Sequence, residues 1–457
     1  MIVRYLKRAA IVLLVLIAAL ALGRLYQVAT ESLYAGERKP YLQVLTTDSV
    51  TIRWQTEDDE TGVVRYGLSP DRLDQLAVEQ DAGEHHELRL SGLEADSRYF
   101  YSAGNRAQAT YSGDEYYFTT APQRGSTDPI RLWIIGDPGK AGPDAVNVRD
   151  SVLEWVGTHP LGNTTKIDLL IGLGDLAYTS GANIDYQQAL FDIYEAVLAN
   201  TPFLAVYGNH DARRWAYFNI FTLPENGEAG GVASGTEHYY SIDYGNAHVV
   251  VLDSQASDRG IESDMYSWLQ KDLQANERIW LIAAFHHPPY TKGTHNSDSR
   301  RDSRGRMQDM RENFLPLLEA HGVDLVFSGH SHMYERSFLI DCHYGYSDTL
   351  DPTAIIDRGS GDPAMNAPYR KAADPRSHQG AVYVVTGSAS KLDQAPIDHP
   401  VMGHSLLELG SVVVDIEGLR LDARFINDKG EVRDHFRIEK SDDSKTRDPS
   451  ACDQQSG

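Results

Sequence analysis

The chain has 457 residues, of which 41% are hydrophobic and 23% charged, a composition typical of globular proteins and a length sufficient for two domains. Its formal net charge of -23 excludes charge-driven binding to a nucleic-acid scaffold or to an anionic membrane surface. An anionic substrate must therefore be held locally, and bound cations would supply the positive charge.

The first element is an apolar run of 14 residues, from Ala9 to Leu22, preceded by Arg4, Lys7 and Arg8. A basic start followed by ~7 to 15 apolar residues is typical of an export signal, whereas ~20 residues span a bilayer comfortably. Small residues at the end of the run permit cleavage, but the run could equally remain as an anchor. We therefore expect residues 1–24 to be a signal peptide or membrane anchor, and the protein to be periplasmic, extracellular or anchored facing outside the cytoplasm.

Residues 38–122 follow as short alternating strands separated by polar turns, which is typical of a small β-sandwich. Trp54 is expected on an inner face. The segment from Leu93 to Tyr99 resembles the tyrosine corner of fibronectin type III domains, in which the tyrosine hydroxyl hydrogen-bonds back to the chain. This first domain is therefore predicted to be a scaffold. Its strands are expected at 49–54, 63–66, 87–90, 99–103 and 116–119.

A second domain is predicted over residues 128–440, where buried strands alternate with amphipathic helices and imply an α/β fold with active-site loops after the strand ends. Because residues 382–438 are mostly strand again, we expect a mixed sheet or two packed sheets. The insert at 341–379 is expected to be a long loop near the site. The remaining strands are expected at 131–136, 168–173, 203–207, 248–252, 280–285 and 323–328, and the helices at 144–157, 186–199, 263–274 and 307–321.

The chain has two cysteines, Cys342 and Cys452, and ends in a polar tail at 441–457. In an oxidising compartment the two could pair and tie the tail to the second domain, although the sequence leaves this open. Two cysteines cannot form a structural zinc site by themselves. The tail has little to bury, so it is expected to be disordered unless Cys452 pins it.

Five short blocks with metal-ligand side chains each follow a predicted strand of the second domain. Oxygen and imidazole donors suit iron, zinc or manganese, and loops at strand ends can converge on one cleft. A carboxylate such as Asp175 can bridge two cations ~3.5 to 4 Å apart, the spacing that clamps the oxygens of a phosphoryl group during displacement. The blocks are Gly136–Gly139, Gly174–Tyr178, Gly208–Asp211, His286–Tyr290 and Gly329–His332.

These blocks resemble those of the calcineurin-like metallophosphoesterases, and specifically of the purple acid phosphatases. Tyr178, three residues after Asp175, marks this branch, as does Gly139 where many other members place a histidine ligand. The resemblance continues into the N-terminal domain at Pro40–Gln43. It implies a fibronectin type III-like β-sandwich followed by an α/β domain with an αββα sandwich of mixed sheets.

The resemblance also implies a metal for each set of ligands. The second set leaves one choice open, because His287 follows His286, but the family pattern places one residue between the ligand and the proline and so favours His286. Asp211 stands where many relatives carry glutamate. The first metal, Fe(III), would take Asp137, Asp175, Tyr178 and His332. The second metal, Zn, Mn or Fe(II), would take Asp175, Asn209, His286 and His330.

His210 and His295 match the family's histidines that contact the phosphate and help to protonate the departing alkoxide. The resulting hypothesis is an enzyme that hydrolyses small phosphate monoesters by in-line attack of a metal-bound hydroxide. One alternative keeps the site and changes the substrate to a nucleotide or glycerophosphodiester. A second alternative is a non-catalytic surface binding protein, which is disfavoured because all seven expected ligands are present.

Overall fold

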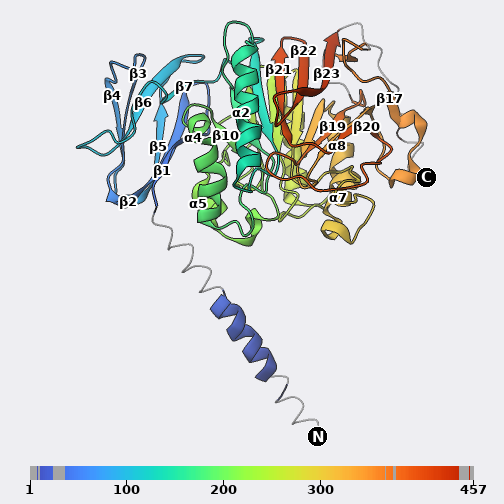
Figure 1. Cartoon of the computed structure of the whole chain (residues 1–457), viewed down its shortest axis with the longest axis horizontal. Helices are drawn as coiled ribbons and strands as arrows, with labels where there is room; N and C mark the ends of the chain where they lie inside the picture. The colour runs from blue at the N-terminus through green and yellow to red at the C-terminus, as the bar shows by residue number, and fades with distance from the viewer. Residues whose placement is uncertain are drawn as a thin grey trace.

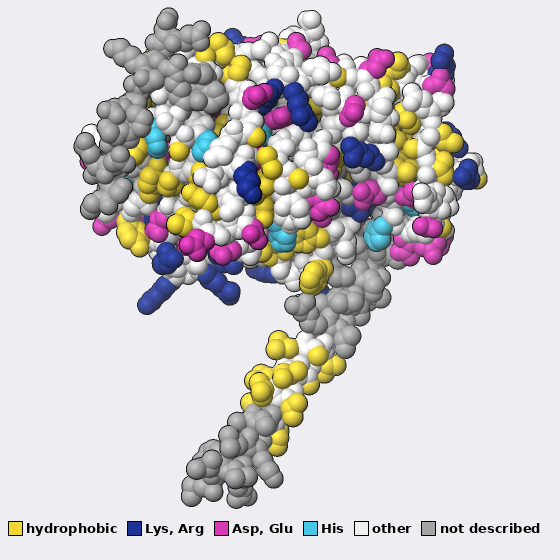
Figure 2. All heavy atoms as spheres, turned by 180° about the vertical axis from the view of Figure 1, so that it is seen from behind, with side chains coloured by type: hydrophobic (Ala, Val, Ile, Leu, Met, Phe, Trp, Pro, Cys, Tyr) yellow, Lys and Arg dark blue, Asp and Glu magenta, His cyan; other side chains and the backbone are white. Residues whose placement is uncertain are grey.

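The computed structural model in Figure 1 describes residues 8, 11–23, 36–365, 367–373, 377–441 and 452. Nearly all of the predicted tail at 441–457 and part of the predicted signal at 1–24 lie outside these residues. Residues 11–23 form a helix whose apolar side chains are exposed, as Figure 2 shows. Among the described segments, no helix is both long enough and apolar enough to cross a membrane.

The N-terminal part is a sandwich of two antiparallel sheets. One sheet has the order β1 (Arg38–Gln43), β2 (Ser49–Glu60) and β5 (Gly83–Ser91). The other has the order β4 (Gln75–Val78), β3 (Val63–Gly67), β6 (Arg98–Gly104) and β7 (Tyr117–Thr119).

Two predicted features of this sandwich are confirmed. Trp54 is 2% exposed, so it is a core residue. The hydroxyl of Tyr99 accepts a hydrogen bond of 3.0 Å from the backbone N–H of Glu94, which is the back-bond of a tyrosine corner. The alternating burial along β5 buries one side of the strand and exposes the other, as expected for the face of a sandwich.

The second part contains two seven-stranded sheets, each with parallel and antiparallel neighbours, so the predicted mixed sheets are confirmed. The first has the order β10 (Phe203–Ala205), β9 (Leu169–Gly172), β8 (Ile130–Ile135), β21 (Gly410–Glu417), β22 (Arg420–Asn427), β23 (Val432–Ser441) and β18 (Tyr369–Ala372). The second has the order β11 (Tyr240–Tyr244), β12 (Ala247–Val251), β13 (Trp280–Ala284), β14 (Leu325–Ser328), β19 (Val382–Thr386), β15 (Tyr334–Ser337) and β20 (Met402–Leu406).

Helices cover the outer faces of the two sheets and complete the αββα layering. On the first sheet lie α2 (Pro143–Thr158), α3 (Asn183–Tyr186), the π-helical turn η1 (Gln187–Phe191), α4 (Asp192–Leu198) and α5 (Ala216–Ile220). On the second lie α6 (Asp264–Ala275), α7 (Arg306–Asp309), the π-helical turn η4 (Met310–Phe314) and α8 (Leu315–Ala320).

The insert at 341–379 is more structured than the expected loop. It contributes β17 (Ile355–Asp357), which pairs with β16 (Leu339–Ile340), and β18, which runs parallel to β23 at the edge of the first sheet. These strands are short and lack a clear alternating pattern, so the sequence did not reveal them. The predicted helices at 186–199 and 307–321 are present but are interrupted by η1 and η4.

The N-terminal sandwich supports the loops of the second part. The Tyr101 hydroxyl donates to the carbonyl of Ala199 at 2.7 Å, just after α4, and the Tyr41 hydroxyl donates to the carbonyl of Ile220 at 2.6 Å, at the end of α5. These buried bonds fix the helices that flank the Gly208–Asp211 block. The first domain therefore contributes to the site by holding its surroundings.

A buried ion-pair triad joins the second sheet to α6. His248, on β12, has Nδ1 2.8 Å from Asp243 and Nε2 2.8 Å from Asp272. Burial alone would lower the pKa of His248, but the hydrogen bonds with the two carboxylates outweigh it and raise the pKa to about 9. His248 is therefore a structural cation.

Replacing His248 with glutamine should destabilise the fold in a pH-dependent way. The raised pKa adds stability that is fully present below the unfolded value of about 6.5 and is lost as the pH rises through about 9. We expect the His248→Gln variant to lose about 3 kcal/mol of unfolding free energy below pH 6.5, measured by denaturant titration. The exposed His159→Gln variant is the control. An equal loss below pH 6.5 and above pH 9 would contradict this role.

Candidate metal centre

The ends of five strands bring the predicted ligands into one place. Asp137 follows β8, the Asp175 block follows β9 and Asn209 follows β10, three parallel neighbours of the first sheet. His286 follows β13 and His330 follows β14, parallel neighbours of the second sheet. Because carboxyl ends of parallel strands lie on the same edge, the loops of both sheets meet there.

The turns that carry these ligands are tight and strained. Asp137, Asp175 and His330 have positive φ angles of 54°, 52° and 68°, a region that residues with a Cβ rarely adopt. At Gly139 a Cβ would lie 2.4 Å from the carbonyl oxygen of Asp175 and 2.5 Å from the backbone nitrogen of Ala177. A histidine at position 139 therefore does not fit, because the first two loops touch there.

One group of donors surrounds Tyr178. Its hydroxyl donates to Oδ1 of Asp137 at 2.8 Å and lies 3.1 Å from Nε2 of His332. Nδ1 of His332 donates to Asp393 at 2.6 Å, so Nε2 presents its lone pair to the other two side chains. A phenol, a carboxylate and an imidazole thus converge.

A second group of donors surrounds His286. Its Nδ1 donates to the carbonyl of Leu173 at 2.8 Å, which leaves a lone pair on Nε2. That Nε2 lies 3.0 Å from Oδ1 of Asn209, 3.2 Å from Nδ1 of His330 and 3.5 Å from Oδ1 of Asp175. The lone pair on Nε2 of His286 and the carboxylate oxygen of Asp175 repel each other at this distance unless a cation lies between them.

Asp175 lies between the two groups, and its electrostatics also indicate a cation. Ligand atoms of Asp137, Asp175 and His286 all lie within 4.8 Å of one another. Burial, followed by the negative charge of Asp137, raises the pKa of Asp175 to about 7. Burial also lowers the pKa of His286, and that of His330 falls well below its usual range. Neutral imidazoles beside repelling carboxylates are suited to ligate a metal ion.

The three other histidines of the sequence prediction take different positions. His287 turns to Ser254, whose hydroxyl lies 2.9 Å from its Nδ1, whereas His286 faces Asn209 and Asp175. His210 lies at the rim, with Nε2 3.9 Å from Asp175. The ring of His295 stacks on that of His330 with centroids 3.8 Å apart. His210 and His295 thus flank the cluster from two sides.

Two positioning residues carried no assigned role in the sequence. Asp393, which orients His332, lies in an irregular loop without a motif, and no sequence pattern indicates it. Asp211 is fully buried and accepts hydrogen bonds from the backbone N–H groups of Leu176 and Gly208 and from the Tyr186 hydroxyl. Asp211 therefore ties the second and third loops together. In the sequence, only its position two residues after Asn209 indicated a role at the site.

Comparison with known proteins agrees with this geometry. Residues 130–334 match the family model described as Calcineurin-like phosphoesterase, and residues 38–120 match Purple acid Phosphatase, N-terminal domain. The chain belongs to the purple acid phosphatase family. Membership makes it an acid phosphatase-type hydrolase of small phosphate esters and implies a centre of two metals.

Relatives of the family are similar over much of the chain. Purple acid phosphatase 22 of Arabidopsis thaliana is 29% identical over 346 residues, which cover 70% of each chain. Purple acid phosphatase 1 of Ipomoea batatas is 30% identical over 270 residues, which cover 55% of this chain and 51% of that one. The structure of purple acid phosphatase PPD1 from yellow lupin has a TM-score of 0.66 at 19% identity, and covers 90% of this chain and 77% of its own. This last likeness establishes the shared fold.

Within this family member, Asp393→Asn should weaken metal binding without unfolding the chain. The amide cannot stabilise the orientation and basicity of His332 as a carboxylate does, and losing such a partner lowers metal affinity on the order of 10- to 100-fold. Metal analysis after dialysis against a graded chelator measures the change. Asp398→Asn, an exposed change in the same loop, is the matched control. Equal metal retention in the two variants would contradict the role of Asp393.

Proposed function

We propose that the chain is a binuclear-metal phosphomonoesterase whose two donor groups share Asp175. The observation that carries the proposal is the convergence of seven donors in two sets with this carboxylate between them. A shared carboxylate suits a pair of cations that neutralise a phosphoryl group as it is displaced. Because the chain has a net charge of -23, the local positive charge of the cations is needed to attract the phosphate.

The donor types support different metals at the two positions. Tyr178 with Asp137, His332 and Asp175 favours Fe(III), because a phenolate stabilises a hard trivalent ion. Asn209, His286 and His330 with Asp175 favour Zn, Mn or Fe(II). When bound, such ions act as Lewis acids toward the phosphate and lower the pKa of the attacking water.

His295 is suited to protonate the leaving alkoxide. Its Nδ1 donates to Oδ1 of Asp302 at 2.8 Å, and this bond fixes the orientation of the ring. Nε2 is then the ring nitrogen that would donate a proton to the leaving oxygen. Asp302 also accepts the backbone N–H of Asn296 at 2.8 Å, which ties it to the same loop.

His210 is better suited to positioning than to proton donation. Its Nδ1 donates to the carbonyl of Thr179 at 2.8 Å, and its Nε2 lies 3.2 Å from Nη2 of Arg213, a group that can only donate. The ring is thus held neutral, and burial lowers the pKa of His210 further. Its backbone N–H also donates to Asp175 at 2.7 Å, so this loop fixes the shared ligand.

We also propose export of the protein. The support is the basic start of the chain followed by the apolar helix at 11–23. Sequencing the N-terminus of protein recovered from outside the cytoplasm separates a cleaved signal from a retained anchor.

The metal assignment is tested with the purified full chain. We expect about two metals per chain and a broad visible band from a Tyr178 phenolate on iron. Tyr178→Phe should remove the band, whereas the exposed Tyr346→Phe should keep it. Asp175→Ala should abolish both metal retention and turnover. A colourless but active wild-type protein would overturn the ferric site, and an active, metal-replete Asp175→Ala protein would overturn the binuclear mechanism.

The role of His295 predicts a dependence on the leaving group. His295→Ala should slow hydrolysis of an alkyl phosphate by about 100-fold or more and affect a nitrophenyl phosphate much less, because only the poor leaving group needs a proton. His210→Ala should slow both to a similar degree. Steady-state kcat values on the two substrates measure this. Equal slowing of both substrates by His295→Ala would contradict proton donation.

Monoester and diester activities must be compared on the same preparation. We expect phenyl phosphate to be hydrolysed faster than bis-phenyl phosphate, as measured by the release of phenol. Faster turnover of the diester would replace the phosphomonoesterase with a phosphodiesterase at the same centre. A metal-replete protein without either activity would favour the non-catalytic binding protein.

A further inference from the structure

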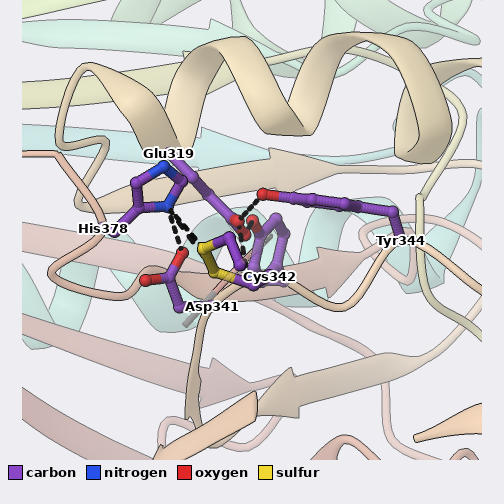
Figure 3. The surroundings of a disulfide bond; sticks show 7 residues. Glu319, Asp341, Cys342, Tyr344 and His378 are labelled. Atoms are coloured by element: carbon purple, nitrogen blue, oxygen red, sulfur yellow. Dashed lines mark hydrogen bonds and ion pairs between the residues drawn. A yellow bond between two sulfur atoms is a disulfide. The ribbon is translucent and has the colours of Figure 1, made fainter. Parts of the chain in front are cut away.

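A second ligand cluster lies apart from the catalytic metal centre and shares no residue with it. Figure 3 shows Asp341, Cys342 and His378 meeting beside α8, where Cys342 is joined to Cys452. One ligand atom from each of these four residues lies within 4.8 Å of the other three. Two sulfur atoms, an imidazole and a carboxylate form a donor set that structural zinc accepts.

The imidazole of His378 lies close to the other three residues of this cluster. Its Nδ1 lies 3.2 Å from Sγ of Cys452, 3.6 Å from Sγ of Cys342 and 3.1 Å from Oδ1 of Asp341. Asp341 is fully buried and Cys342 is 1% exposed. The four ligand atoms thus lie close enough together to surround one ion, and two of the four residues are buried while His378 and Cys452 are partly exposed.

The scaffold around the cluster holds the donors in place through Glu319, near the end of α8. Its carboxyl group accepts the backbone N–H of Cys342 at 2.8 Å and the Tyr344 hydroxyl at 2.6 Å, and it also bonds the Tyr383 hydroxyl. Its backbone carbonyl accepts the N–H of His378 at 2.9 Å. One residue therefore positions two donors that are 36 residues apart in the chain.

The backbone at the cluster is strained as it is at the catalytic centre. Cys342 and His378 have positive φ angles of 63° and 59°, in the left-handed region where a Cβ is costly. Asp137, Asp175 and His330 share this feature at the catalytic centre. Strained non-glycine residues gather at sites that bind ligands.

We propose that the reduced chain binds one Zn²⁺ through the thiolates of Cys342 and Cys452, Nδ1 of His378 and a carboxylate oxygen of Asp341. The two thiols release their protons on binding, because only thiolates ligate the ion. The site would tie residue 452 to α8 and β16 without a covalent bond.

The disulfide in the structure is the alternative state of the same two sulfurs. Conversion of the zinc form needs a two-electron oxidant, such as a disulfide compound. The two thiolates lose two electrons and form the sulfur–sulfur bond, the oxidant takes up these electrons and two protons to become two thiols, and Zn²⁺ is released. The states exclude each other because sulfurs joined in a disulfide no longer carry the charges that hold the ion.

Cobalt provides the test, because sulfur-to-cobalt charge transfer gives a near-ultraviolet band that requires a thiolate, and the disulfide-bonded sample, which keeps the other metal centre but has no thiolate, supplies the baseline. The full chain is reduced with a phosphine, and Co²⁺ is added to it and to a disulfide-bonded sample. We expect the band to saturate at one Co²⁺ per chain in the reduced sample, to disappear on addition of Zn²⁺, and to be absent from the oxidised sample.

Variants separate zinc binding from folding. Cys452→Ser should lose the band. His378→Ala should still form the disulfide, as measured by mass, but should bind Co²⁺ at least ~10-fold more weakly. Removing a residue that hydrogen-bonds a ligand lowers metal affinity by about 10-fold or more, and removing a ligand itself lowers the affinity at least as much. The exposed His159→Ala is the matched control and should bind as wild type. Absence of the band in the reduced, folded wild type would overturn the proposal, as would wild-type binding by His378→Ala.

Discussion

The repulsion between two buried carboxylates, Asp137 and Asp175, is the constraint on which the rest of the site depends. Both are almost fully buried, and their mutual charge together with burial raises the pKa of Asp175 to about 7. Cations bound between the two carboxylates would compensate this repulsion. Burial lowers the pKa of His286, so this histidine is neutral and, like Asn209, can offer a lone pair to a cation. The fold therefore brings together donors whose mutual repulsion a bound cation would relieve.

The surrounding layers hold these donors against their repulsion. The left-handed backbone at the ligand-bearing turns is maintained by close contacts between loops, such as Gly139 against the backbone of Asp175. Asp211 bonds two of these loops to each other, and the N-terminal sandwich fixes the flanking helices through Tyr41 and Tyr101. These contacts restrict the positions that the donor side chains can adopt, and so favour one coordination geometry for a bound metal.

The two ligand clusters differ in the softness of their donors. The proposed metal centre has oxygen and nitrogen donors, which suit hard and borderline ions that activate water. The cluster around His378 adds two sulfurs, which suit zinc when reduced and a covalent bond when oxidised. Both clusters rest on a carboxyl group that accepts backbone N–H groups, Asp211 in one and Glu319 in the other. In both clusters, therefore, a carboxyl group that is hydrogen-bonded to the backbone holds the donors in place.

The sequence by itself determined the architecture and indicated the donor residues that the structure brings together. Hydrophobic patterns predicted the β-sandwich, the mixed sheets and most strands, and the motifs with their family resemblance predicted which donor residues converge, because these features depend on the order of residues within one strand and its following turn. The tertiary structure alone decided what pairs across the chain: that Asp393 orients His332, and that His378 completes a cluster with two cysteines. Such contacts join segments tens to hundreds of residues apart, and no local pattern encodes which of them meet.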